Sequence, residues 1–272
     1  MLRLRYVGLR ASLMLASLLT SVLLSVAMPL SEAHANIIGT DDRTLPPRVE
    51  GTLLESVGIL KSVPDDGGWG TAFVIGNGCY IMTAYHAAFP LRNGVRPQPS
   101  PNVVSEFHVM QNERQFSFKR KYTARPYRWG HVDLDWAILK LDNCNPGDLH
   151  PTIVQSMGEG QTIQEPLLPV GYPQDRANEA GMLVQKHCAS RLAGETFTYA
   201  YTDCDSAGGM SGAPVFVRRR IQGSGPQLVN VVVGMILGSH EAAPNGRASQ
   251  FSKDVGTIIL HMEPVMPWAN LL

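Results

Sequence analysis

The sequence predicts an all-β protein, and two observations favour this class. From position 51 onward, short apolar runs rich in β-branched residues alternate with turn-forming residues. No internal repeat and no long amphipathic helical pattern interrupts them. Many short strands of this kind are typical of sandwiches and barrels. We expect strands within residues 57–60, 71–75, 80–83, 107–110, 136–141, 167–173, 181–185, 196–201, 215–217, 229–237 and 257–260.

Three connecting stretches organise these strands. Residues 36–50 show no apolar period and predict an extended arm. Gly76-Asn77-Gly78 lies between two expected strands and predicts a hairpin turn. Residues 142–162 are rich in Asn, Asp, Pro and Gly, so they predict a polar crossing between two halves of the fold.

Length and charge limit the possible partners. The chain has 272 residues, of which 44% are hydrophobic, enough to bury the core of one large or two small domains. Basic and acidic residues are equal in number, so the formal net charge is zero. Such a balance offers no electrostatic basis for binding nucleic acid or an anionic membrane surface. We therefore expect no nucleic-acid partner.

The first residues have the layout of a secretory signal peptide. Three arginines, at positions 3, 5 and 10, precede an apolar run over residues 11–27, and Ala33-His34-Ala35 offers a small-residue cleavage site. The alternative is an uncleaved membrane anchor, which the serines within the run disfavour. We expect residues 1–35 to be removed, leaving an exported, periplasmic or extracellular protein without stable membrane association.

The cysteines fit an exported chain. Cys79, Cys144, Cys188 and Cys204 are even in number and none has C-x-x-C spacing. No other metal-ligand spacing is present, so we expect no metal site. Four cysteines allow three pairings. We favour Cys79–Cys144 and Cys188–Cys204 because each pair then lies within one half of the expected fold.

One serine lies in a tight turn that leads into a strand. In Asp205-Ser206-Ala207-Gly208-Gly209-Met210-Ser211-Gly212-Ala213-Pro214-Val215, small residues surround Ser211. Glycines allow backbone geometry and close approach that larger residues block. Such a turn can direct backbone N–H groups at a developing oxyanion. A Gly/Ser turn by itself, however, is most often only a loop.

Two further stretches carry the other residues of a hydrolytic site. Ile81-Met82-Thr83-Ala84-Tyr85-His86 places a histidine after an apolar strand, and Asp133-Leu134-Asp135-Trp136 places an aspartate at the entry to another. "TAYHA" resembles the "TAAHC" of chymotrypsin-fold (trypsin-like) serine endopeptidases, "DWAILKL" resembles their "DIALLKL", and "GGMSGAPV" resembles their "GDSGGPV". The order His, Asp, Ser also matches this fold. "IIGTDDR" and "VGYPQD" resemble the bacterial glutamyl-endopeptidase (V8-type) branch.

This resemblance implies two six-stranded antiparallel β-barrels with the active site between them. The arm and first barrel would occupy residues 36–150, and the second barrel residues 151–272. Ser211 would be the nucleophile, His86 the general base and Asp135 the residue that orients the imidazole. Asp133 is a weaker candidate for the third role because Asp135 has the family spacing to the strand. By analogy, the N–H groups of Gly209 and Ser211 would form the oxyanion hole.

The implied function is an exported serine endopeptidase that hydrolyses peptide bonds through an acyl-enzyme intermediate. It would act as a monomer on protein or peptide substrates and need no cofactor. One alternative is a catalytically silent homologue that uses the cleft only for binding. Another is an α/β-type esterase, which fits poorly because His86 precedes Ser211 in the chain and the serine lies in G-M-S-G-A.

The substrate pocket is harder to assign. Asp205, followed by Ser206, lies six residues before Ser211, where trypsin carries its pocket aspartate; there it would favour Arg or Lys. Alternatively, Asp205 is a loop carboxylate held by backbone N–H groups. The V8-type branch uses a histidine in the strand corresponding to Gly234–Gly238, but Ile236 occupies the aligned position and only His240 is near.

Activation also departs from the trypsin pattern. Trypsin-type zymogens carry an aspartate just before the nucleophile, which pairs with a newly released N-terminal amine. Met210 occupies this position. We therefore expect an enzyme that folds in an active form, or one that is regulated in another way.

Overall fold

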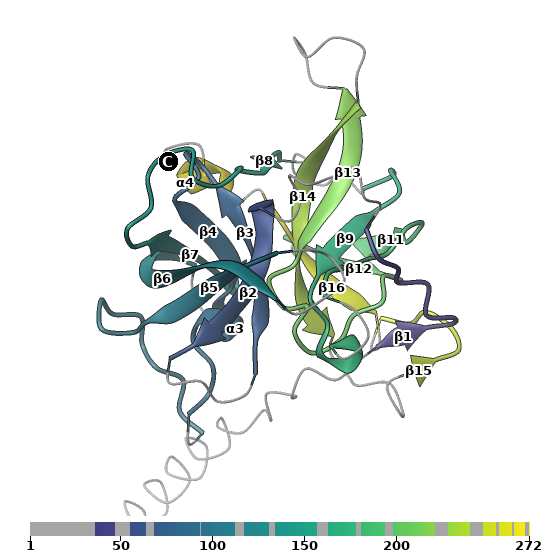
Figure 1. Ribbon diagram of the computed structural model, residues 1–272. Helices are drawn as coiled ribbons and strands as arrows, with labels where there is room; N and C mark the ends of the chain where they lie inside the picture. The colour runs from purple at the N-terminus through teal and green to yellow at the C-terminus, as the bar shows by residue number, and fades with distance from the viewer. Residues whose placement is uncertain are drawn as a thin grey trace, which may run out of the picture. The chain divides into compact units, whose positions relative to one another are not determined.

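Two curled β-sheets form the protein, which we describe from a computed structural model (Figure 1). The structure describes residues 36–46, 55–63, 68–92, 94–111, 117–130, 134–156, 163–177, 181–193, 198–220, 228–239, 247–253, 256–262, 264–269 and 272. The expected leader, Asp133 and His240 lie outside these described residues.

The first sheet closes into a barrel of six antiparallel strands. The expected hairpin turn is present, and both of its glycines have positive φ, +64° at Gly76 and +94° at Gly78. Around the barrel the order is β2-β3-β4-β7-β6-β5. The strands are β2 (Val57–Ser62), β3 (Gly70–Ile75), β4 (Tyr80–Ala84), β5 (Ser105–Met110), β6 (Phe118–Trp129) and β7 (Trp136–Leu141).

The second sheet follows the order β10-β9-β13-β14-β16-β12-β11. A bridge between Leu167, beside β9, and Cys188, before β11, links segments next to strands near opposite ends of this sheet, which is therefore strongly curled. The polar crossing contributes one short strand, β8, which pairs in parallel with β14. The elements are β8 (Ile153–Val154), β9 (Leu168–Gly171), η1 (Gln174–Arg176), β10 (Leu183–Val184), β11 (Ser190–Ala193), β12 (Tyr199–Thr202), β13 (Pro214–Arg220), β14 (Leu228–Ser239) and β16 (Thr257–His261). The expected all-β, two-barrel architecture is confirmed.

One apolar cluster joins the two barrels. It combines Val57 and Phe73 of the first barrel with Phe216 and Leu260 of the second, all buried. Tyr172, after β9, has no exposed area, and its hydroxyl donates a hydrogen bond to the Val57 carbonyl oxygen over 3.0 Å. Burial raises the pKa of this phenol. The barrels therefore share this apolar cluster, in addition to a separate cluster within each barrel, and it fixes the surfaces that meet between them.

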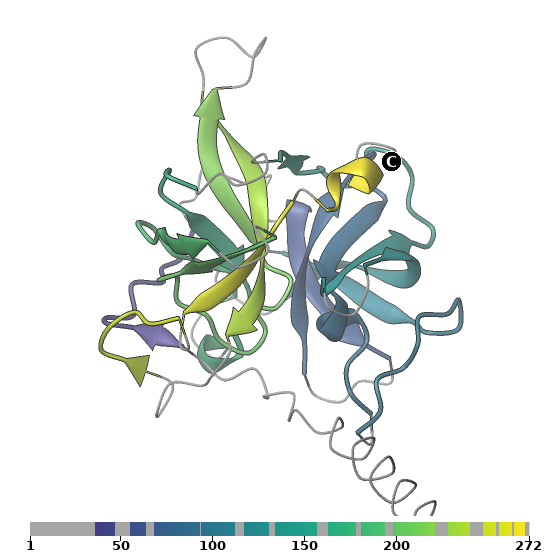
Figure 2. The same ribbon diagram turned by 180° about the vertical axis from the view of Figure 1, so that it is seen from behind.

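Each half also holds one disulfide. Cys79 is bonded to Cys144 in the first half, and Cys188 to Cys204 in the second. Near the C-terminus, α4 (Met266–Ala269) is followed by Leu272, which lies against Gly76 at the β3–β4 turn (Figure 2). Of the helices in the described part of the chain, none has the length and apolar character of a membrane span.

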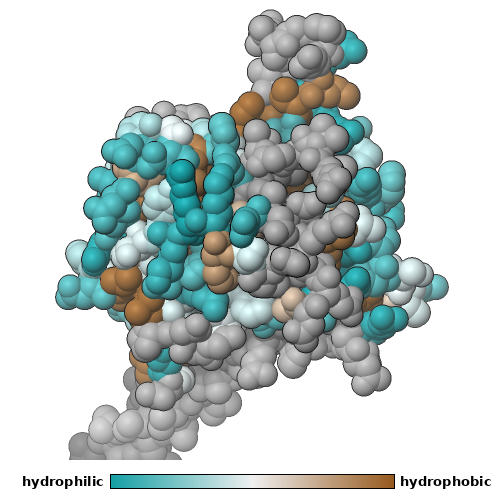
Figure 3. Space-filling view, in the orientation of Figure 1, coloured by the Kyte–Doolittle hydropathy of each residue, from teal (hydrophilic) through white to brown (hydrophobic). Residues whose placement is uncertain are grey.

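The hairpin of β13 and β14 extends beyond the rest of its sheet (Figure 1). Its far end exposes apolar residues (Figure 3), including Leu228, which is 59% exposed. Arg219 lies on the same hairpin and is ion-paired with Glu165 over 2.8 Å.

The N-terminal arm runs along the second barrel, although it precedes the first in sequence. Its strand β1 (Ile37–Ile38) pairs in parallel with β15 (Arg247–Ala248). Farther along, Thr44 and Val184 exchange two backbone hydrogen bonds of 2.7 and 2.8 Å. The extended conformation of the arm was expected from the sequence. Its pairing with β15 joins residues that are some two hundred positions apart, and local patterns do not predict such a contact.

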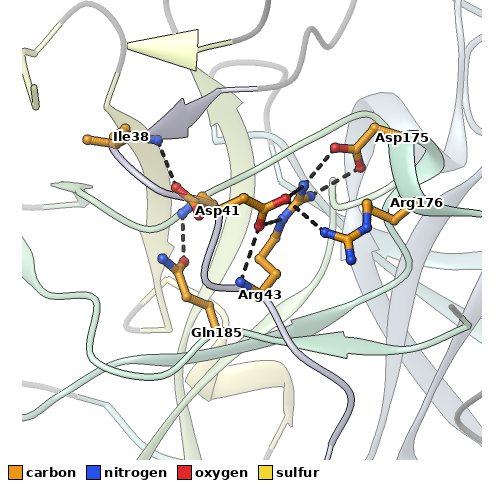
Figure 4. Close-up of polar contacts among 7 residues, drawn as sticks. Ile38, Asp41, Arg43, Asp175, Arg176 and Gln185 are labelled. Atoms are coloured by element: carbon orange, nitrogen blue, oxygen red, sulfur yellow. Dashed lines mark hydrogen bonds and ion pairs between the residues drawn. The ribbon is translucent and has the colours of Figure 1, made fainter. Parts of the chain in front are cut away.

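A buried ion cluster attaches the arm (Figure 4). The Arg43 side chain is only 1% exposed; its Nε and Nη2 donate to the two Asp41 carboxylate oxygens, each over 2.9 Å. Nη1 and Nη2 also donate to Asp175 in η1, over 3.1 and 2.6 Å. Arg176 completes the cluster by donating to Asp41 over 3.0 Å. The hydrogen bond from Arg43 holds the pKa of Asp41 at about 2.

We expect Arg43→Met to destabilise the protein by about 3 kcal/mol, because it leaves two carboxylates without their shared buried cation. Urea unfolding would measure this loss. The matched control is Arg125→Met, which breaks the exposed Arg125–Asp142 pair and should cost about 1 kcal/mol or less. Equal costs for the two variants would show that the cluster does not hold the arm.

Candidate active site

His86 and Asp135 lie close together because the end of one strand pairs with the start of its neighbour in the first barrel. β4 pairs with β7, and Ala84, the last residue of β4, lies opposite Trp136, the first of β7. His86 follows β4 in the helical turn α3 (Tyr85–Ala88), and Asp135 precedes β7. The His86 Nδ1 atom is 2.7 Å from Asp135 Oδ2, and the His86 backbone N–H donates to Oδ1 over 2.9 Å.

This pairing selects one tautomer of the imidazole. An ionised carboxylate only accepts hydrogen bonds, so Nδ1 carries the proton that it shares with Asp135. In the neutral ring, Nε2 is then left with a lone pair and can act as a base. The side chains of His86 and Asp135 are 27% and 21% exposed, so the pair lies at the surface of the barrel edge.

The backbone of Asp135 is strained in order to make both contacts. Its φ is +47°, in the left-handed region that residues other than glycine rarely adopt. Its carbonyl oxygen also accepts a 3.0 Å hydrogen bond from the Tyr85 N–H. Strain of this kind costs on the order of 1–3 kcal/mol and is concentrated at functional sites.

Ser211 lies in a loop made of two consecutive tight turns. Gly209 and Gly212 have φ of +89° and +87°. The Met210 N–H donates to the Ala207 carbonyl over 3.0 Å, and the Ala213 N–H to the Met210 carbonyl over 2.8 Å. A Cβ atom at position 212 would overlap backbone of the first barrel. The glycines are therefore required both by backbone conformation and by close packing.

Several buried residues of this loop have a backbone N–H group without a partner. Within the described ranges, no hydrogen bond engages the N–H groups of Gly209 and Ser211, although Ser211 is only 6% exposed. Buried backbone donors are almost always paired, so an unpaired pair in adjacent turns calls for a functional explanation. An oxyanion that forms during reaction would supply the missing acceptor.

The serine loop and α3 meet at Gly70 of the first barrel. A Cβ atom on Gly70 would lie 2.7 Å from the Ala87 Cβ and 3.1 Å from the Ser211 carbonyl oxygen. Ser211 and the residue after His86 thus border the same point. In the described part of the chain, no hydrogen bond joins the Ser211 hydroxyl to the His86 ring.

Asp205 is buried and contacts the arm. It has no exposed area, and its Oδ1 accepts a 2.8 Å hydrogen bond from the Ile38 N–H. The Asp205 N–H donates to Gln185 Oε1 over 2.6 Å, whereas Oδ2 has no partner among the described residues. Burial raises the pKa of Asp205 to about 7. These contacts favour the interpretation of Asp205 as a loop carboxylate held by backbone N–H groups.

The other pocket candidates are spread around this loop. Ser206 exchanges backbone hydrogen bonds of 2.6 and 3.0 Å with Asn36, and its hydroxyl is 2.9 Å from that of Thr257. Ile236 is fully buried in β14, whereas a Cβ at Gly238 would meet nothing within 4 Å. Asp205 and Ser206 are thus brought together with the arm, a neighbourhood that nothing in the sequence indicates.

Residues of the first barrel border the serine loop and were not identified from the sequence. The Thr71 hydroxyl donates a hydrogen bond to the Gly209 carbonyl oxygen over 2.7 Å. The ring N–H of Trp69 donates to the Tyr172 carbonyl oxygen over 2.8 Å. Threonine and tryptophan are ordinary strand residues, so their type carries no signal for such a role. Among the described residues, no cluster of three side chains suited to metal binding is present.

Comparison with known proteins places this geometry in a family. The sequence matches the trypsin-like peptidase domain over residues 70–220, and no curated protein matches it significantly. The structure of a Glu endopeptidase in complex with MPD has a TM-score of 0.59 at 14% identity, covering 87% of this chain and 100% of that one. Deg5 has a TM-score of 0.51 at 14% identity, over 80% of this chain and 88% of that one. A serine endoprotease from Yersinia pestis has a TM-score of 0.51 at 13% identity, over 82% and 66%.

At such identities the solved structures show the fold alone. The family match covers more than half of the chain and contains His86, Asp135 and Ser211. This protein therefore belongs to the trypsin-like peptidase family and is a serine protease.

Proposed function

We propose that the protein is an exported serine endopeptidase in which Ser211, His86 and Asp135 form the catalytic triad. The observation that carries this proposal is the His86–Asp135 pair, held by two hydrogen bonds, at the edge that borders a serine turn in which the N–H groups of Gly209 and Ser211 are unpaired. Each part has a matching chemical task. Asp135 orients the ring, His86 moves the proton, and the turn receives negative charge.

The reaction proceeds in two acyl-transfer steps. Ser211 Oγ attacks the carbonyl carbon of the scissile peptide while His86 Nε2 takes the hydroxyl proton. The carbonyl oxygen becomes an oxyanion that accepts hydrogen bonds from the N–H groups of Gly209 and Ser211. His86 then protonates the leaving amine, and an ester of Ser211 remains. Water, deprotonated by His86, hydrolyses this ester and restores the serine hydroxyl.

The second candidate is a catalytically silent homologue that only binds peptides. The absence of a hydrogen bond between Ser211 and His86 in the described part of the chain favours it. Hydrogen bonds of catalytic groups are, however, often long or poorly aligned in unliganded enzymes and tighten when substrate binds.

Export is proposed from the leader-like first 35 residues and is supported by the two disulfides. Disulfides persist in oxidising compartments and are rare in the cytosol. Met210, buried before the nucleophile, cannot form the ion pair that activates trypsin-type zymogens. We therefore propose that the mature chain is active without an ion pair between residue 210 and an N-terminal amine.

A fluorophosphonate probe should label the wild-type protein at Ser211, and Ser211→Ala should abolish labelling and lower kcat by about 10⁴- to 10⁶-fold. Mass spectrometry of the labelled peptide and hydrolysis of a mixed peptide library measure the two effects. Folded wild-type protein that neither reacts with the probe nor cleaves any peptide would support the silent homologue.

Asp135→Asn should lower kcat by about 10⁴-fold while the fold is kept. Asparagine tolerates the positive φ and still accepts the His86 N–H, but its amide group stabilises the wrong imidazole tautomer. Steady-state kinetics and near-ultraviolet circular dichroism give the two readouts. A loss of less than tenfold in correctly folded enzyme would remove Asp135 from the triad.

We propose a structural role for Asp205, so Asp205→Asn should leave the residue preference at the cleavage point unchanged. Its folded pKa of about 7 lies above the ordinary value of 3.8, so the protonated form stabilises the fold below about pH 4, and this stability is lost as pH rises through 7. The variant should flatten this dependence by a few kcal/mol between pH 4 and 8, measured by urea unfolding. The control Asp142→Asn, at a partly exposed carboxylate, should keep the pH dependence of the wild type. A preference for Arg or Lys that disappears in Asp205→Asn would instead place Asp205 in the pocket.

A further inference from the structure

We propose that Thr71 is a positioning residue that holds the oxyanion-forming turn in its working conformation from the opposite barrel. The inference rests on the proposed function of the Ser211 loop. Thr71 is the second residue of β3 and has no exposed area. Its hydroxyl donates to the Gly209 carbonyl oxygen over 2.7 Å, and its backbone N–H donates to the Ser211 carbonyl oxygen over 2.9 Å.

The hydrogen bonds of the four peptide units between residues 208 and 212 show how the two contacts of Thr71 hold this turn. All four carbonyl oxygens, from Gly208 to Ser211, accept hydrogen bonds. Gln174 N–H binds the first over 2.6 Å, and Ala213 N–H binds the third over 2.8 Å. Thr71 binds the second and the fourth. Of the four N–H groups in these peptide units, those of residues 210 and 212 are paired, and those of residues 209 and 211 are not.

Gly209 gives this loop rotational freedom at the peptide that Thr71 contacts. It has no Cβ and a φ of +89°, so side-chain sterics do not restrict rotation of its flanking peptides. A rotation of the Gly209–Met210 peptide would change where the neighbouring N–H groups point. The bond from the Thr71 hydroxyl to the carbonyl oxygen opposes this rotation directly.

The direction of that bond is fixed by its surroundings. The Tyr172 N–H donates to Thr71 Oγ1 over 3.1 Å, so the single hydroxyl proton is available to Gly209. The Thr83 hydroxyl donates to the Thr71 carbonyl over 2.8 Å and anchors the strand from β4. Because Thr71 is fully buried, water cannot take the place of a deleted hydroxyl without rearrangement.

The test compares Thr71→Val, Thr71→Ser and a matched control, Thr202→Val. Valine keeps the branched shape and the backbone N–H but removes the hydroxyl, whereas serine keeps it. Thr202 is also fully buried; its hydroxyl donates to the Thr257 carbonyl over 3.2 Å and accepts from the Cys204 N–H over 3.3 Å. Its loss therefore removes the same kinds of hydrogen bond in the second barrel, without a hydrogen bond to residues 208–212.

We expect Thr71→Val to lower kcat by about 10- to 100-fold with little change in KM, because preorganised donors act mainly on the transition state. Active sites are counted by fluorophosphonate titration, so a smaller folded fraction does not affect kcat. Affinity for a peptide aldehyde, which forms the tetrahedral adduct, should fall in parallel. Thr71→Ser should return kcat to within about threefold of wild type, and Thr202→Val should lose stability but keep its kcat.

A Thr71→Val enzyme with the kcat of Thr202→Val, or with a change in KM alone, would overturn the proposal. If Thr71→Val does not fold, Thr71→Cys replaces it; its weaker thiol donor should give an intermediate loss of kcat, and wild-type kcat in that variant would also overturn the proposal. Measurements on the wild type distinguish a failure of the proposed function from a failure of the proposal for Thr71. Failure of the wild type to react with the probe or to cleave peptides refutes the proposed function, whereas unequal labelling and turnover among the variants concern Thr71.

Discussion

The proposed active site depends on how closely the serine turn approaches β3 of the other barrel. Gly212 has no Cβ, and any side chain there would overlap the Thr71 carbonyl oxygen and the Thr83 hydroxyl. Only because this space is empty can the Thr71 N–H reach the Ser211 carbonyl over 2.9 Å. The backbone of the serine turn in the second barrel is therefore in direct contact with the backbone of β3 in the first. A contact of this kind has few degrees of freedom, so a nucleophile on one barrel can be placed accurately against a base on the other.

The residues of the proposed triad could be selected from the sequence because their local patterns are strong. His86 and Asp135 each lie at the end of an apolar run, and the family motifs surround them. The pairing of Ala84 with Trp136 then brings the two ends together. The sequence could not reveal the cost of this arrangement, namely the positive φ of Asp135. Only the three-dimensional requirement that one carboxylate hold both the ring and the backbone N–H of His86 explains it.

Other parts depend on contacts between distant residues, which local patterns do not encode. The arm was predicted to be extended, and it is, but its pairing with β15 and its contact with Asp205 join segments from opposite ends of the chain. Asp205 shows the same limit, because its spacing to Ser211 fits a pocket residue, whereas its burial and the Ile38 N–H fit a structural one. Thr71 resembles any other strand threonine until the Gly209 carbonyl is placed beside it.

The arm and Leu272 each contact the half of the fold that is farther from them in sequence. The arm precedes the first barrel but is fixed to the second by Arg43 and Thr44, and Leu272 follows the second barrel but lies against Gly76 of the first. A cut within the polar crossing would thus give two fragments, each carrying a segment whose binding surface belongs to its counterpart. Each fragment would therefore lack contacts that the intact chain supplies, and reassembly would require each segment to bind its surface on the other fragment.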